Sequence, residues 1–288
     1  MTGKLFVGCA IWAYDGWVGN FYPAATAKED RLRAYAARLN TVEVNSTFYA
    51  IPNLSTFQKW AAETPETFQF CPKFPKSITH TALLHDTKPQ TSAFLGVARA
   101  LGPRLGPLML QLSPSFGPSR IGALGSYLNA LPSDLEITVE VRHADWFKPK
   151  GVELLERVLA EHGAGKVLFD SRPVYASSAP EAIGALEKKP NVPLIAEANQ
   201  PFVLIRYISS PILEENTPYL QDWSSRIATW LGQDRRVYFF AHCPVEELSP
   251  NIARLLYHKV AAQFELPPLA WDTLESTPPT ALAQLTLF

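Results

Sequence analysis

The stretches TVEVN at Thr41–Asn45 and ITVEVR at Ile137–Arg142 decide the fold, because each alternates valine with a charged or amide side chain. Successive side chains of a β-strand point to opposite faces, so each segment has one apolar face and one polar face. The residues of the two polar faces are Glu43, Asn45, Glu140 and Arg142. A carboxylate buried without partners is very costly, so each polar face must meet water, a ligand or counter-charges. Two such strands about a hundred residues apart predict convergence on one pocket.

The same alternation of side chains predicts six more strands, which gives eight in total. Most of them end on a polar or ionisable residue of the less apolar face. These terminal residues are Asn45, Lys73, Arg142, Asp170, Arg206 and His242. The eight predicted strands are Leu5–Cys9, Thr41–Asn45, Phe68–Lys73, Leu108–Ser113, Ile137–Arg142, Lys166–Ser171, Phe202–Tyr207 and Val237–His242.

Segments with apolar side chains at helical spacing separate these strands. They cover Glu29–Leu39, Leu54–Glu63, Ser92–Leu101, Ile121–Leu131, Val152–His162, Thr217–Leu231 and Asn251–Gln263. Strand and helix that alternate about eight times predict an α/β fold, a (β/α)8 TIM-type barrel, as one domain over residues 1–288. The active site of such a barrel lies at the C-terminal ends of its strands. A doubly wound open sheet is the alternative, but its buried strands are apolar on both faces.

The composition is typical of one enzyme-sized globular domain. Hydrophobic residues make up 47% of the chain and charged residues 18%, which is ample for a large core. The net charge of −1 gives no general attraction to polyanions or membranes. The chain has no run of eighteen apolar residues, and its start, MTGKLF, has no apolar signal-peptide region. Three widely spaced cysteines without a C-x-x-C pair suit a reducing compartment, so we expect a cytoplasmic protein that does not contact the membrane.

Two connections depart from the regular alternation. The segment Ser171–Pro201 is far longer than the usual loop between a strand and a helix, even with a predicted helix near Glu181–Lys189. It leaves the sheet at the predicted active-site end and could cover the site. The first such loop, Trp12–Pro23, is rich in aromatic residues. It is either an aromatic plug that closes one side of the barrel or a stacking platform for a sugar or base.

Five sequence blocks together resemble the YecE-like family, known as domain of unknown function 72. They are GCAIWAYDGWVGNFYP at Gly8–Pro23, TVEVNSTFYAIP at Thr41–Pro52, FQKWAAETPETFQFCPKFPKSITH at Phe57–His80, LGPLMLQLSPSF at Leu105–Phe116 and VEVRHADW at Val139–Trp146. The resemblance implies a TIM-type barrel of the xylose-isomerase-like and endonuclease-IV-like kind, and it implies no particular reaction.

Two blocks differ from the pattern of that family. RYISS at Arg206–Ser210 stands where the family usually has an Arg-x-His-Gly element. FAHCP at Phe240–Pro244 stands where it usually has a Phe-Asn-Asn element. The resemblance therefore implies a changed active-site end at the seventh and eighth strands.

The polar strand ends supply the candidate site residues. If the alternation holds, Glu43, Lys73, Gln111, Glu140, Arg142 and Asp170 all point into the barrel at its C-terminal end. The candidate catalytic residues are Glu43, Lys73, Glu140 and Asp170. The candidate substrate-binding residues are Asn45, Gln111, Arg142, Arg206 and His242, with Trp12 and Tyr14 from the aromatic loop. Repulsion between clustered acids predicts that Glu43→Gln or Glu140→Gln leaves thermal stability unchanged or raised.

Structural roles are open for the same residues. Glu140 and Arg142 could form an ion pair that serves only packing, Lys73 could be a solvated lysine at the rim, and Asp170 could orient the loop that follows it. A metal cluster of His80, His143 and His242 with Glu43, Glu140 and Asp170 is a further alternative. The alternation argues against it, because His143 has the opposite parity to Glu140. The chain also has no H-E-x-x-H spacing, so no metal ligand is assigned.

Three functional hypotheses follow. The mixture of acids, bases and amides favours an enzyme that uses carboxylate and lysine acid–base chemistry on a small polar substrate carrying an anionic group. The endonuclease-IV-like relatives suggest a nucleic-acid-binding or repair protein as the alternative, which the overall neutrality of the chain disfavours. A barrel that has lost its catalytic activity is the third hypothesis. The sequence identifies no cofactor: it has no P-loop or G-x-G-x-x-G pattern.

Overall fold

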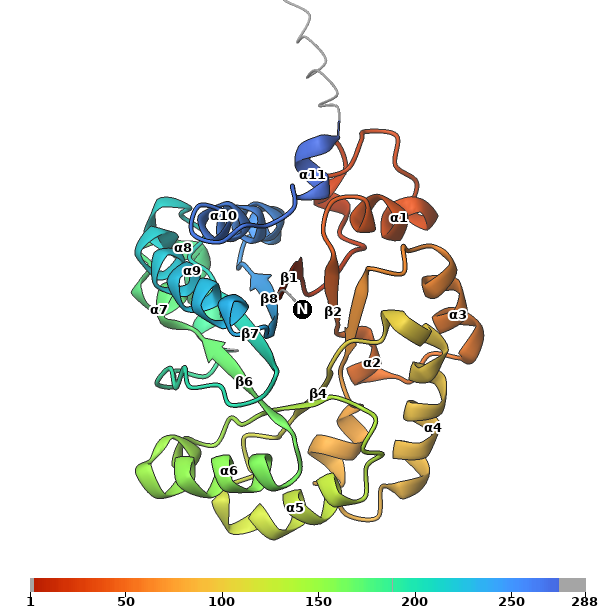
Figure 1. Cartoon of the computed structure of the whole chain (residues 1–288), viewed down its shortest axis with the longest axis vertical. Coiled ribbons are helices and arrows are strands. Elements are labelled where there is room, and N and C mark those ends of the chain that lie inside the picture. Colours follow the sequence, from red (N-terminus) through yellow and green to blue (C-terminus); the bar gives the residue numbers. More distant parts are fainter. Residues whose placement is uncertain (1–2, 188, 275–288) are drawn as a thin grey trace, which may run out of the picture.

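The structure is a computed structural model that describes residues 3–187 and 189–274. Eight parallel strands form one sheet in the order β3-β2-β1-β8-β7-β6-β5-β4. Its two outermost strands meet through bridges that pair Phe70 with Leu105 and Lys73 with Met109, which makes the sheet a nearly closed barrel (Figure 1). The strands are β1 (Lys4–Cys9), β2 (Thr41–Val44), β3 (Gln69–Pro72), β4 (Leu108–Gln111), β5 (Ile137–Glu140), β6 (Gly165–Asp170), β7 (Phe202–Ile208) and β8 (Arg236–His242). The predicted TIM-type fold is confirmed.

Helices cover the outside of the barrel, and each of the eight predicted helices has a counterpart (Figure 1). These counterparts are α1 (Arg31–Ala36), α3 (Leu54–Ala62), α4 (Lys88–Ala98), α5 (Ile121–Asn129), α6 (Pro149–Glu161), α8 (Pro180–Leu186), α9 (Thr217–Gly232) and α10 (Ser249–Ala261). The remaining helices are α2 (Ser46–Tyr49), α7 (Arg172–Ala176) and α11 (Ala270–Thr273). α3 begins after Asn53, whose side chain accepts a hydrogen bond from the Thr56 N–H at 2.9 Å and so caps the helix.

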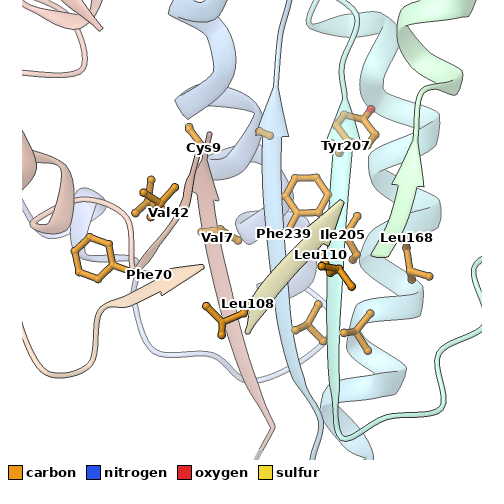
Figure 2. Close-up of a cluster of buried hydrophobic side chains, with 14 of the residues drawn as sticks. Val7, Cys9, Val42, Phe70, Leu108, Leu110, Leu168, Ile205, Tyr207 and Phe239 are labelled. Atoms are coloured by element: carbon orange, nitrogen blue, oxygen red, sulfur yellow. The ribbon is translucent and has the colours of Figure 1, made fainter. Parts of the chain in front are cut away.

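Alternate side chains of each strand build two different cores. The outward-facing set is apolar and packs against the helices, and Figure 2 shows this cluster. Its labelled members are Val7, Cys9, Val42, Phe70, Leu108, Leu110, Leu168, Ile205, Tyr207 and Phe239. The inward-facing set near the N-terminal ends of the strands forms a second, smaller apolar core. Its members are Phe6, Cys71, Met109, Val167, Phe202, Leu204, Tyr238 and Phe240. The interior is therefore apolar at that end, which leaves the polar inward-facing residues at the C-terminal end, called the mouth here.

The aromatic first loop packs into the apolar layer between the sheet and the helices. The Trp17 side chain is fully buried, and its ring packs against those of Phe21, Tyr22 and Tyr35. The Tyr22 hydroxyl donates to the carbonyl of Trp12 at 2.7 Å, which fixes the loop against itself. These contacts are structural, as the plug interpretation expects.

The outer surface of the barrel carries a groove between α4 and α5. The groove has a volume of about 1050 Å³, and Leu84, Leu95 and Tyr127 are among its lining residues.

Within residues 3–187 and 189–274, no helix combines the length and apolar character that crossing a membrane requires. The predicted domain extends to residue 288, but positions 275–288 lie outside the described residues.

Candidate functional site

The guanidinium of Arg206, on β7, is the centre of the mouth. Its Nε and Nη2 donate to the two carboxylate oxygens of Glu43 on β2, at 2.7 and 2.9 Å. Its Nη1 donates to Oε2 of Glu140 on β5, at 2.7 Å. All three side chains are almost completely buried. One arginine thus holds together strands from opposite sides of the barrel, and its two carboxylates outweigh burial and raise its pKa.

Glu43 receives two further contacts. The Lys73 ammonium lies 2.9 Å from Oε1, and His242 Nε2 lies 3.2 Å from Oε2. Burial alone would raise the pKa of Glu43, but Arg206, Lys73 and His242 outweigh it and hold that pKa well below its usual range. Burial lowers the pKa of His242 to about 3, so its imidazole is neutral near pH 7. Because an ionised carboxylate can only accept hydrogen bonds, Nε2 carries the proton of this neutral ring.

The other half of the mouth is built around Gln111, on β4. Its side-chain oxygen accepts from the Lys73 ammonium and from Arg142 Nη2, both at 3.2 Å. Arg142 Nε donates to Oε1 of Glu140 at 2.7 Å. Burial opposes the ionisation of Glu140, but Arg206, Arg142 and Lys73 prevail and lower its pKa to about 2. Burial and Arg206 lower the pKa of Lys73 to about 8.

These seven side chains form one connected set, which we call the mouth ring. Its members are Glu43, Lys73, Gln111, Glu140, Arg142, Arg206 and His242. With His242 neutral, three cations face two carboxylates, so the ring carries a net charge of +1. The whole chain has a formal charge of −1. Positive charge is therefore concentrated at the mouth. The ring confirms the predicted inward direction of Glu43, Lys73, Gln111, Glu140 and Arg142.

The prediction that Asp170 points into the barrel is wrong. Its carboxylate accepts hydrogen bonds from Trp223 Nε1 on α9 at 2.8 Å and from the Arg172 guanidinium at 2.9 Å, outside the sheet. The inward-facing residues of β6 are instead Val167 and Phe169. The Phe169 ring lies 5.7 Å below the Arg206 guanidinium, so this strand contributes an aromatic face rather than a charge.

The loop residues predicted to bind substrate have structural contacts. Trp12 packs edge-on against Trp60 of α3 and Phe70, on the outer face of the sheet, so it is no stacking platform over the mouth. The Tyr14 hydroxyl donates to Glu247 Oε1 at 2.5 Å, in the loop after β8. Asn45, just beyond β2, donates to the carbonyl of Ala10 at 3.1 Å and joins the ends of β1 and β2.

Two charged residues near the mouth were missed by sequence reasoning. Lys189 comes from the long connection after β6, and its ammonium lies within electrostatic reach of Arg206, Glu43 and Arg142. Burial and those two arginines lower its pKa to about 8. Glu246 comes from the 3₁₀ turn Glu246–Leu248 that follows β8. Lys189 stands at the end of the predicted helix near Glu181–Lys189, and no pattern in the sequence places either residue at the mouth.

The histidines of the metal alternative do not gather. His80 lies on a π-helical turn, Ser77–Thr81, where its Nδ1 is 2.8 Å from the Thr79 hydroxyl. His143 accepts from the Asp145 N–H and is half-exposed. Among the described residues, no three His, Cys, Asp or Glu side chains are arranged to hold a metal ion.

Comparison with known proteins gives one family. The family described as protein of unknown function DUF72 matches residues 6–277. The UPF0759 protein YecE of Escherichia coli (strain K12) is 35% identical over 256 residues, which are 88% of this chain and 91% of YecE. A DUF72 family crystal structure from Enterococcus faecalis V583 has a TM-score of 0.68 and 18% identity, and the alignment covers 92% of this chain and 97% of that one. The structure described as AsfvAP:AG has a TM-score of 0.53 and 9% identity, and covers 91% and 99%. The two structures show the fold alone.

Proposed function

The chain belongs to the DUF72 family, the UPF0759 or YecE-like proteins, and we propose that it is an enzyme whose barrel mouth binds a small anionic substrate. The net positive charge of the mouth ring is the observation that carries this proposal. A network that served packing alone would hold equal numbers of positive and negative charges, because an uncompensated charge away from water is costly. In the ring the buried Lys73 and Arg206 balance Glu43 and Glu140, and the partly exposed Arg142 is the cation in excess. A bound phosphate or carboxylate would supply the missing negative charge.

The cation that reaches this substrate is Arg142. It is the most exposed charged side chain of the ring, at 15%, against 5% for Lys73 and 2% for Arg206. Its Nε and Nη2 bind Glu140 and Gln111, and no described residue accepts a hydrogen bond from its Nη1. Glu140 and Gln111 therefore orient the guanidinium for a charge-assisted bond to an anion.

The position of Lys189 also supports an anion site at the mouth. The Lys189 carbonyl accepts from the Tyr175 hydroxyl at 2.7 Å, and the Pro190 carbonyl accepts from the Ser171 hydroxyl at 3.0 Å. These bonds hold the long connection beside the end of β6. A fourth cation added to a positive ring raises the local potential further, and an anion bound there would relieve the repulsion.

Acid–base chemistry in this proposal rests on the groups that can change protonation near pH 7. Glu43 and Glu140 cannot, because their ion pairs hold both carboxyl pKa values far below neutrality. They are assigned the role of orienting the arginines. Lys73, with a pKa of about 8, is the member of the ring that is suited to move a proton or to attack a carbonyl group.

Titration calorimetry with inorganic phosphate tests the anion site. We expect Arg142→Met to weaken phosphate binding about tenfold or more, because a hydrogen bond to a charged group contributes about 1.5–3 kcal/mol. Arg33→Met is the matched control, because Arg33 lies on α1 with a 67% exposed side chain. Phosphate binding that is equal in the wild type and in both variants, or absent from the wild type, would contradict the proposal.

A further inference from the structure

Glu246 is a partly exposed residue beside the mouth, and one oxygen of its carboxyl group has no hydrogen-bond partner among the described residues. Its Oε1 is shielded from solvent, and no donor lies within hydrogen-bond distance of it among the described residues. The turn Glu246–Leu248 directly follows β8, so it stands at the end of the barrel where the mouth ring lies. Buried polar atoms normally have partners, so an unpartnered oxygen beside the mouth is available to a ligand.

The aromatic loop holds the turn that carries Glu246 in place. Trp17 Nε1 donates to the backbone carbonyl of Glu246 at 2.9 Å, and the Tyr14 hydroxyl binds the side chain of Glu247. Gly16 allows this close approach, because a Cβ atom there would lie 2.7 Å from Glu247 Oε1 and 2.5 Å from the Tyr14 ring. Two loops distant in sequence thus fix the backbone on which Glu246 stands.

The charged groups within electrostatic reach of Glu246 come from three elements. They are Lys189 in the connection after β6, Glu43 on β2 and Glu247 in its own turn. Burial is the main influence and raises the pKa of Glu246 to about 7, with help from Glu247 and Glu43. The Ser249 hydroxyl and the Lys189 ammonium oppose that rise only in part.

We infer that Glu246 is the residue that accepts and returns a proton at the substrate bound in the mouth. The inference rests on the proposed function and extends it. In the forward step an X–H bond of the substrate breaks, Oε1 takes the proton to form an O–H bond, and the electron pair stays on the substrate. The negative charge that develops there faces Lys189 and Arg142. In the reverse step the Oε1–H bond breaks and the proton returns to the substrate. Glu43 and Glu140 stay ionised and orient the arginines, whereas Glu246 changes its protonation state and transfers the proton.

Proton uptake on sulfate binding tests this inference without a known substrate. Sulfate does not titrate near pH 7, and a bound dianion raises the pKa of a neighbouring carboxyl group. We therefore expect the wild type to take up a fraction of a proton at pH 7, measured by calorimetry in buffers of different ionisation enthalpy. Lys73 and Lys189, both mostly protonated at that pH, contribute the smaller part.

The variant Glu246→Gln should lose the larger part of this uptake and bind sulfate as tightly as the wild type or more tightly, because it lacks a repelling charge. Glu247→Gln is the control from the same turn and should keep the uptake. Glu246→Asp retains a carboxyl group on the same turn and should keep part of it. Equal uptake in the wild type and in Glu246→Gln would overturn the inference alone. Absence of sulfate binding in the wild type would overturn the proposed function and this inference with it.

Discussion

Arg206→Met should lower the free energy of unfolding by about 3–5 kcal/mol, because removal of one partner leaves buried charges uncompensated. The two carboxylates of Glu43 and Glu140 would each lose their contacts with the guanidinium at 2.7–2.9 Å. In a domain of this size such a loss corresponds to a fall of roughly 10 °C in Tm. Urea unfolding followed by circular dichroism measures the effect.

Arg226→Met is the matched control for that substitution. Arg226 pairs with Asp222 on the surface of α9, where its side chain is 43% exposed, and such pairs contribute about 0–1 kcal/mol. Equal effects of Arg206→Met and Arg226→Met would contradict the central role of Arg206.

Trp17→Ala should cost about 3–5 kcal/mol, the usual range for a fully buried tryptophan. Its ring packs against those of Phe21, Tyr22 and Tyr35, and its Nε1 bond to the Glu246 carbonyl would also be lost. Tyr49→Ala is the control, because Tyr49 is an aromatic residue with 80% exposure and should change stability by less than about 0.5 kcal/mol. Thermal unfolding that is unchanged in Trp17→Ala would contradict the plug.

The alternation of valine with charged residues correctly predicted, for most strands, which side chains point into the barrel and which point outward. In β2 and β5 the two faces differ so strongly in polarity that only one orientation is possible, and Glu43 and Glu140 lie where the alternation places them. Periodicity also locates the residues of the ring at strand ends. It cannot show that one arginine binds two of them, since Arg206 is 163 residues from Glu43 and 66 from Glu140.

The sixth strand shows where the same argument fails. Val167, Leu168 and Phe169 are all apolar, so the sequence does not say which face of β6 is turned inward. Val167 and Phe169 point into the barrel interior. Asp170 lies among the helices, where Trp223 and Arg172 compensate its charge. Polarity at a strand end is therefore a weak indicator when both faces of the strand are apolar.

The ion pairs of Glu43 reverse the expected effect of Glu43→Gln on the free energy of unfolding. Repulsion among the acids would make Glu43→Gln harmless or stabilising. In the structure Glu43 contacts Arg206, Lys73 and His242, so its negative charge is already compensated. We now expect Glu43→Gln to be destabilising, because the substitution leaves the cations of the ring in excess. The positions of Lys189 and Glu246 could not be predicted either, because α8 ends at Leu186 and both residues lie in irregular segments whose course depends on tertiary contacts.

The central claim is that the mouth ring with Lys189 is an anion site. The most direct measurement is an anomalous difference map from crystals soaked in selenate, a tetrahedral dianion whose selenium atom can be located without bias. We expect a selenium peak at the mouth, with selenate oxygens within hydrogen-bond distance of the Arg142 guanidinium and the Lys189 ammonium. Crystals of Arg142→Met should lose that peak. Selenium peaks confined to the outer surface of the wild-type protein, with none at the mouth, would contradict the claim.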